Sequence, residues 1–184
     1  MELAVTNADF YLKILGPEDT AVVHAYFRDN AAHLAPWEPL RPANFYAPET
    51  LRVRLSNAFD EAACGTAFQF GIISRETGDM LGACNFTGIA RGPFQACHLG
   101  YSVAENQQGK GLMHRSLTTA IDYLFREQGL HRIMASYIPD NHKSERVLLR
   151  LGFEREGYAK SYLKIAGCWQ DHVLTSLINP HDNA

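Results

Sequence analysis

The junction at residues 108–111, where Gln108 is followed by Gly109, Lys110 and Gly111, limits the folds open to this chain more than any other segment. It follows residues that alternate like a strand and precedes a long helical pattern. The apolar face of that helix comprises Leu112, Met113, Leu117, Ala120, Ile121, Leu124 and Phe125. Glycines let the backbone approach a ligand closely, and the N–H groups and dipole of a helix start attract an anion. The junction predicts a phosphate site, although a plain strand-to-helix turn also fits.

Two common phosphate-binding loops do not match this junction. A nucleoside triphosphate loop needs G-x-x-x-x-G-K-[ST], whereas Lys110 is followed by Gly111 and leaves no hydroxyl for magnesium. A dinucleotide fingerprint needs a further glycine inside a parallel β-α-β unit. The preceding strands read as an antiparallel meander, so both kinds of loop are disfavoured.

The remaining periodicities predict an α+β fold, with a mixed, mostly antiparallel sheet of seven strands flanked by about four helices. Helices are expected through Tyr26 and Phe27, from Pro48 towards Gly65, from Leu112 towards Gly129, and over 144–151. The predicted strands are 10–15 (at the sheet edge), 67–73, 80–89, 96–103, 132–138, 154–165 and 169–177.

Composition fits one domain over residues 1–184, with its core at about 8–179. The net charge of -3 gives no support to binding of nucleic acid or an anionic membrane. The first residues lack the basic and apolar regions of a signal peptide, and no apolar run reaches the roughly 20 residues of a membrane span. We therefore expect a cytoplasmic protein with no membrane partner.

The cysteines Cys64, Cys84, Cys97 and Cys168 lie far apart and form no C-x-x-C pair. Such spacing argues against a zinc site or a redox dithiol. They are expected to be reduced thiols in the core, and no metal is expected.

A proline-rich segment between His33 and Pro48 carries large aromatic rings. Its prolines resist regular structure, and its rings are Trp37, Phe45 and Tyr46. This composition indicates an ordered loop over a site.

Several separate segments resemble one known family. Gln108 to Gly111 after a strand, Asn141 to Ser144 at a helix start, and Leu151-Gly152-Phe153 after that helix are similar to motifs of the GNAT (GCN5-related N-acetyltransferase) superfamily. Within it, further segments resemble the Rim-type ribosomal-protein-alanine acetyltransferases. These segments are Pro36-Trp37-Glu38-Pro39, Leu99-Gly100-Tyr101-Ser102, Asn141-His142-Lys143-Ser144, the stretch from Leu151 to Tyr158, and Trp169-Gln170-Asp171-His172.

The resemblance implies a single GNAT domain that uses acetyl-CoA as cosubstrate. It assigns the pantetheine arm to Leu99, Gly100, Tyr101, Ser102 and Val103, and the pyrophosphate to the amides of Gln108, Gly109, Lys110, Gly111, Leu112 and Met113. It further assigns Asn141 to the coenzyme and Ser144 to the sulfur. From the residues alone, Asn141 could equally be a helix cap, and Gly100 a plain strand glycine.

Two positions depart from the family's pattern. Met113 stands where the motif has glycine or alanine, and we expect it on an exposed first turn of the helix. Leu148 stands where many members carry a tyrosine that serves the leaving thiolate. That role therefore falls to Ser144 or to a tyrosine elsewhere.

The general base has two candidates. His98 precedes Leu99 on a strand where related enzymes often carry a glutamate, and imidazole has a suitable reference pKa. Glu38 lies beside Trp37 and could deprotonate or bind a cationic amino terminus. The alternatives are a strand histidine that points to solvent or is hydrogen-bonded in the sheet, and a solvated loop acid.

The final hairpin carries side chains that could line an acceptor groove. They are Tyr158, Tyr162, Trp169, Asp171 and His172. Cross-strand packing explains the rings equally well. Trp37, Glu38, Tyr158 and Asp171 are the predicted contacts of the acceptor substrate.

These features predict an enzyme that acetylates the N-terminal α-amino group of an alanine-starting small-subunit ribosomal protein, by direct attack of the amine on the thioester. The expected partners are the N-terminal segment of that protein and the ribosome. Two alternatives stay open, because a fold does not fix an acceptor. One is acetylation of a small amine, and the other is a non-catalytic protein that binds CoA or assists ribosome assembly.

Overall fold

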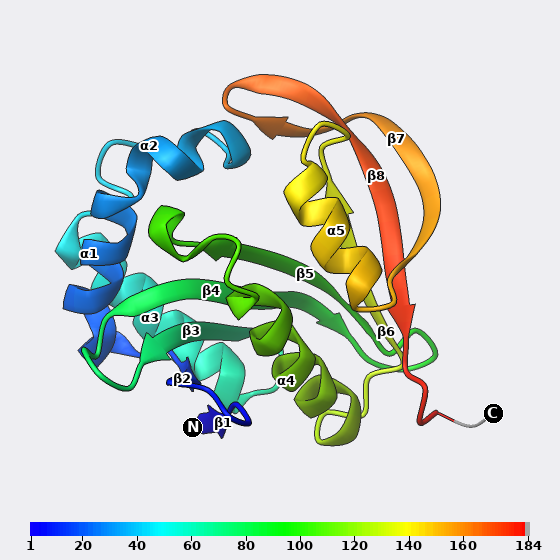
Figure 1. The fold of residues 1–184 in the computed structure, drawn as a ribbon, viewed down its shortest axis with the longest axis horizontal. Helices are drawn as coiled ribbons and strands as arrows, with labels where there is room; N and C mark the ends of the chain where they lie inside the picture. The colour runs from blue at the N-terminus through cyan, green and yellow to red at the C-terminus, as the bar shows by residue number, and fades with distance from the viewer. Residues whose placement is uncertain (183–184) are drawn as a thin grey trace.

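The structure, a computed structural model, describes residues 1–182; residues 183 and 184 of the predicted domain lie outside the described residues. Its strands form one mixed sheet (Figure 1) in the order β1-β2-β3-β4-β5-β6-β8-β7. Their bounds are β1 Glu2–Ala4, β2 Phe10–Ile14, β3 Phe68–Ser74, β4 Met80–Ala90, β5 Ala96–Val103, β6 Arg132–Tyr137, β7 Glu154–Ile165 and β8 Cys168–Ile178.

Only β5 and β6 pair in parallel among these strands of residues 1–182, and the other neighbours pair antiparallel. The predicted mixed sheet and the meander of β3, β4 and β5 are confirmed. The expected edge position of residues 10–15 is wrong, because β1 pairs with β2 and raises the strand count to eight. Three residues are too few for a detectable alternation, which is why β1 was missed.

Five α-helices accompany the sheet in the described part of the chain. They are α1 Thr20–Asp29, α2 Ala31–Leu34, α3 Pro48–Ala63, α4 Leu112–Arg126 and α5 His142–Arg150. The additional helix, α2, continues into a 3-10 turn at Ala35–Trp37, so the first part of the proline-rich segment is helical. Pro36 fits this turn because its missing N–H is not needed there.

The helices cover both faces of the sheet. On one face, α4 and α5 bury Leu117, Leu124 and Leu148 against the side chains of β2 to β6. On the other face, α1 and α3 bury Val23 and Leu51 in a second apolar cluster. Two layers of helix thus enclose the sheet and fix the positions of the strand ends from which α4 and α5 begin.

Two of the four cysteines are not core thiols. Cys84 and Cys97 are buried, but Cys64 and Cys168 are exposed, and all four are free. Cys64 caps the end of α3, and Cys168 follows the hairpin turn. The expectation of four buried thiols is therefore wrong, because both exposed positions fall where an element meets solvent.

Candidate functional site

Strands β5 and β6 separate halfway along β5. They pair from Ala96 with Arg132 as far as Leu99 with Ala135, whereas β5 stays paired with β4 as far as Val103. Beyond Leu99, one edge of β5 therefore has no strand partner among residues 1–182. Backbone groups on such an edge are free to bind an extended ligand with amides of its own.

Gly100 lies at the point of separation. A methyl group built on its α-carbon would meet no atom within 4 Å, so the space beside the strand is open. This geometry fits the close approach of a pantetheine arm, and the assignment of Leu99 to Val103 stays a prediction.

The junction before α4 presents backbone amides in the way its glycines predict. Gly109 and Gly111 adopt φ of +74° and +72°, and Gly111 is the N-cap of α4. Arg115 is the first residue of α4 whose amide donates a hydrogen bond along the helix, to the carbonyl of Gly111 at 3.2 Å. The preceding N–H groups of the first turn therefore point out of the helix end, where an anion is stabilised. The amide of Gln108 is instead used locally, donating to the carbonyl of Glu105 at 3.3 Å.

The side chain of Gln108 connects this junction to α2 and α5. Its Oε1 accepts from Lys143 Nζ on α5 at 2.6 Å, and its Nε2 donates to His33 Nε2 on α2 at 2.9 Å. Lys110 lies at the same junction, 3.2 Å from Gln107 Oε1. The two lysines supply positive charge where phosphates are predicted. Sequence reasoning missed His33 and the role of Lys143, since nothing local links them to Gln108.

Met113 is buried rather than exposed. Its side chain is 6% exposed, and its Sδ lies 3.8 Å from Cys84 Sγ on β4. The expectation of an exposed first turn is wrong because α4 lies on the sheet from its first residue, which points both Leu112 and Met113 into the core. Only their backbone amides remain available for an anion.

The start of α5 gathers three side chains at the separation of β5 and β6. Asn141 caps the helix, because its Oδ1 accepts from the amide of Ser144 at 3.1 Å. The hydroxyl of Tyr101 on β5 lies 2.7 Å from Ser144 Oγ and 3.2 Å from the Ser144 carbonyl oxygen. Burial raises the pKa of Tyr101 above its ordinary value, so this phenol stays protonated.

Leu148, one turn beyond Ser144, points into the core and is 1% exposed. It cannot donate a proton. Sequence reasoning assigned Tyr101 a role through its backbone only, and the structure adds its side chain to the site.

Glu38 is held between the proline-rich loop and the final hairpin. Its Oε2 accepts from the hydroxyl of Tyr46 at 2.7 Å, while its backbone carbonyl accepts from the amide of Ala166 at 2.9 Å. The ring of Tyr46 stacks on Phe27 of α1 with centroids 4.4 Å apart. Burial and the Glu38 carboxylate raise the pKa of Tyr46, which keeps it a donor. The predicted loop is helical as far as Trp37, and Trp37 beside Glu38 is exposed.

On the final hairpin, the carboxylate of Asp171 holds a bulge in β7. Oδ1 accepts from the amide of Ser161, and Oδ2 accepts from Tyr158, both at 2.8 Å. Ser161 has φ of +48°, at the register shift between Ala159 and Leu163. Tyr158 and Asp171 therefore lie together, and their role towards an acceptor stays a prediction. His172 is buried, with its ring 5.6 Å from that of Tyr162.

His98 lies apart from the other candidates. It is exposed on β5, and alternation places it on the face opposite Leu99, which is buried under α4. No hydrogen bond in residues 1–182 joins it to Glu38 or Ser144. Its role as a base stays a prediction.

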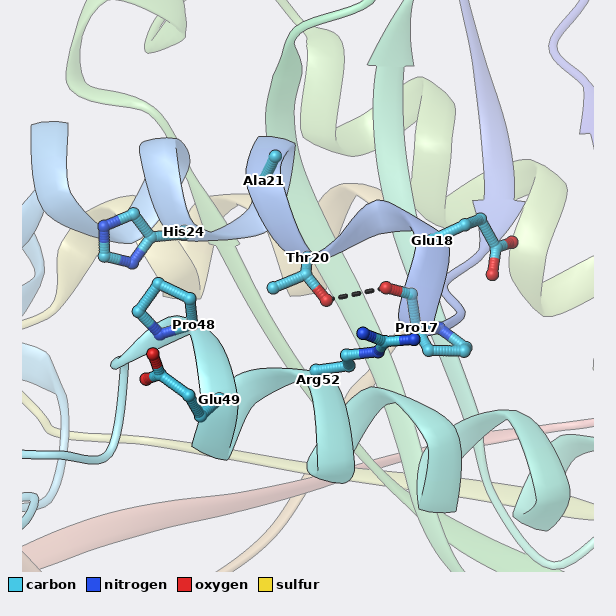
Figure 2. A pocket seen from close by; sticks show the side chains of 8 residues that line it. All are labelled: Pro17, Glu18, Thr20, Ala21, His24, Pro48, Glu49 and Arg52. Atoms are coloured by element: carbon cyan, nitrogen blue, oxygen red, sulfur yellow. Dashed lines mark hydrogen bonds between the residues drawn. The ribbon is translucent and has the colours of Figure 1, made fainter.

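A separate hollow lies between the starts of α1 and α3 (Figure 2). Thr20, His24, Glu49 and Arg52 are among its lining residues, and none of the lining comes from β5, α4 or α5. Charges of both signs line it, and it includes no glycine amides. It is separate from the junction before α4, where the phosphate site is predicted.

The sequence pattern of the acetyltransferase (GNAT) domain matches residues 10–154, well over half of the chain. The chain belongs to the GNAT family. A curated relative of this GNAT protein, ribosomal protein uS5-alanine N-acetyltransferase of Escherichia coli K12, is 42% identical over 179 residues, covering 97% of this chain and 92% of that protein. The family resemblance inferred from the motifs is confirmed.

Solved structures agree with this GNAT assignment. The ribosomal-protein-S5-alanine acetyltransferase of Vibrio fischeri has a TM-score of 0.95 at 40% identity, with 100% of both chains covered. RimJ of Mycobacterium smegmatis, solved in complex with CoA-disulfide, has a TM-score of 0.88 at 28% identity, covering 100% of this chain and 88% of that one.

Two features are absent from residues 1–182. No helix there has the length and apolar character needed to cross a membrane. No group of three or more His, Cys, Asp and Glu side chains in that range is placed to hold a metal ion.

Proposed function

We propose that this GNAT protein transfers the acetyl group of acetyl-CoA to the N-terminal α-amino group of an alanine-starting ribosomal protein. The observation that carries the proposal is the 42% identity to the uS5-alanine enzyme over nearly the full length of both chains. The cytoplasm, where ribosomes are made, is the proposed location.

The coenzyme would lie along the separation of β5 and β6. The free edge from Gly100 to Val103 offers partners to the amides of the pantetheine arm. Amides from Gly109 to Met113 would hold the pyrophosphate, with Lys110 and Lys143 as nearby cations. Acetyl-CoA supplies an acyl group on a thiolate leaving group, whose conjugate thiol has a reference pKa of about 8.5.

Ser144 is the proposed group at the sulfur. Its hydroxyl lies at the start of α5, within the opening between the two strands, and the helix dipole there favours negative charge. A hydrogen bond from Ser144 Oγ would stabilise the sulfur as it gains the electron pair of the carbon–sulfur bond.

Glu38 and Trp37 are the proposed contacts of the acceptor amine. Tyr46 engages only one oxygen of Glu38, so the other oxygen can accept from a cationic amino terminus. An α-amino group has a reference pKa of about 7.7–8.0, so little help is needed to remove its proton. Glu38 or His98 would take that proton, and Tyr158 and Asp171 would contact the following residues.

The test is acetylation of synthetic N-terminal peptides. Purified protein with acetyl-CoA should release free thiol with an alanine-starting ribosomal peptide, and none with the same peptide blocked at its amino terminus. Mass spectrometry should place one acetyl group on the first residue.

Other outcomes would support the competing hypotheses. Equal or faster turnover with free polyamines, amino acids or aminoglycosides, independent of peptide length, would overturn the peptide acceptor in favour of a small amine. Coenzyme binding without transfer to any amine would favour a non-catalytic role. Cosedimentation with ribosomal subunits tests the proposed association with the ribosome.

A further inference from the structure

The hydroxyls of Tyr101 and Ser144 meet across the opening between β5 and α5. Their oxygens are 2.7 Å apart, the ordinary length of an O–H···O hydrogen bond. Both residues are partly buried, and the ring of Tyr101 packs against the core under α4. The contact thus joins β5, where Tyr101 packs against the core, to the first turn of α5.

The protons available to this pair allow two arrangements. Tyr101 can donate to the Ser144 carbonyl at 3.2 Å while the serine donates to the phenol oxygen, or Tyr101 can donate to Ser144 Oγ at 2.7 Å. The second contact is the shorter. It also leaves the serine proton free to turn away from Tyr101 and into the opening.

We infer that Tyr101 is a positioning residue, which donates to Ser144 Oγ and thereby directs the Ser144 proton to the sulfur of the thioester. This inference rests on the proposed function. In the transfer step, the amine nitrogen forms a bond to the acetyl carbon, the carbon–sulfur bond breaks, and its electron pair leaves on sulfur. The proton lost by the amine goes to the base or to water, while Ser144 keeps its own proton and donates a hydrogen bond to the thiolate.

A second tyrosine–serine pair on the same strand supplies the matched control. The hydroxyl of Tyr26 on α1 lies 2.9 Å from Ser102 Oγ, one residue beyond Tyr101 and therefore on the other face of the sheet. Tyr26→Phe removes a buried phenol that is also hydrogen-bonded to a serine, without touching Ser144. Burial raises the pKa of Tyr26 to about 12, so this phenol is also neutral at the assay pH.

The experiment measures kcat and KM for Tyr101→Phe, Ser144→Ala, the double variant and Tyr26→Phe, with coenzyme A affinity determined by calorimetry. Tyr101→Phe should lower kcat by about three- to tenfold, the effect of one oriented hydrogen bond, with KM for acetyl-CoA and coenzyme A affinity changed less than twofold. The double variant should equal Ser144→Ala, and Tyr26→Phe should match the parent.

Two results would overturn the inference while leaving the proposed function intact. One is an active parent whose kcat survives Tyr101→Phe. The other is a double variant whose kcat falls by the product of the two single-variant factors, which would show that Tyr101 acts independently of Ser144. A parent that acetylates no amine would instead contradict the proposed function itself.

A fluorinated tyrosine at position 101 tests the same idea without removing the hydroxyl, in case Tyr101→Phe fails to fold. Fluorine strengthens the phenol as a donor, so kcat should rise, and the rise should vanish in the Ser144→Ala background. A kcat that falls, or one that rises equally without Ser144, would contradict the inference.

Discussion

The amide of Ala166 donates to the carbonyl of Glu38 over 2.9 Å, which joins the tip of the final hairpin to the proline-rich loop. Ala166 and Gly167 form the two-residue turn of this hairpin, with φ of +48° and +85°. Leu40 lies over the turn, so that a methyl group on Gly167 would come within 3.0 Å of its Cδ1. The position of Glu38 therefore depends on a turn more than 120 residues away in the sequence.

Replacing Ala166 by Asn should stabilise the protein. Both turn residues have positive φ, a conformation that alanine adopts at a cost of about 1 kcal/mol and that Asn-Gly turns favour. We expect the free energy of unfolding to rise by up to about 1 kcal/mol in urea denaturation, with kcat unchanged, because the Ala166 amide is retained. Lower stability would show that contacts with the proline-rich loop, rather than the Ala166-Gly167 turn itself, determine the backbone conformation at residue 166.

Tyr46→Phe should weaken acceptor binding. It removes the donor to Glu38 and keeps the ring that stacks on Phe27. Loss of a hydrogen bond worth about 1 kcal/mol predicts a roughly fivefold higher KM for the acceptor peptide, with KM for acetyl-CoA unchanged. Tyr123→Phe, which removes a phenol on α4 that accepts from Gln128, is the control and should leave both values alone. An equal rise in both KM values would argue against a specific role of Glu38 at the acceptor.

Gly109→Ala should abolish tight coenzyme binding, whereas Gly78→Ala should not. The two glycines have φ of +74° and +76°, and neither has an atom within 4 Å of the added methyl group. Each variant therefore carries the same backbone strain, about 1–2 kcal/mol. Only Gly109 lies at the start of α4, so only its methyl group would occupy the predicted phosphate space. Calorimetry with coenzyme A checks this, and equal affinities would contradict the site.

Asp171→Asn should remove a pH-dependent part of the stability. The amide of Ser161, and then the hydroxyl of Tyr158, hold the pKa of Asp171 below its ordinary value. Because this pKa is lower in the folded protein, the carboxylate stabilises the fold at pH values above its pKa in the unfolded chain, about 3.9. The stabilisation is lost as the pH falls through the pKa of the folded protein. The difference in stability between parent and variant should be constant near neutrality and vanish in acid, as urea denaturation at several pH values will show.

The control is Asp60→Asn, which makes the same substitution at an exposed aspartate on α3, away from the hairpin. A parent–variant difference at Asp171 that stays the same after the carboxylate has been protonated in acid would mean that its charge does not hold the bulge.

Local signals in the sequence predicted most of the fold. The apolar face of α4 runs through successive turns from Leu112 to Phe125, and all of it is buried. The Ala166-Gly167 turn and the break at Gly111 also depend on nearby residues, because only certain backbone conformations connect their elements. The sheet position of β2 could not be predicted in this way, since it depends on pairing with the three residues of β1.

The site was harder to predict because its side chains meet through the tertiary fold. His33 and Gln108 are joined by a hydrogen bond across 75 positions of sequence, and Tyr101 meets Ser144 across 43. Their residue types allow many partners. The exposure of Met113 was mispredicted for the related reason that α4 contacts the sheet from its first turn. The family motifs predict the backbone of the site, and the structure shows the side-chain contacts around it.

Successive residues of β5 alternate between the core side of the sheet and its open side. This alternation restricts how the strand can change during evolution. Leu99 belongs to the core and Tyr101 meets Ser144, while Gly100 between them faces the open side. A single-residue insertion before Leu99 would exchange the two faces and lose both the core contact of Leu99 and the Tyr101–Ser144 hydrogen bond. Drift in this strand should therefore proceed by substitution and not by changes of length.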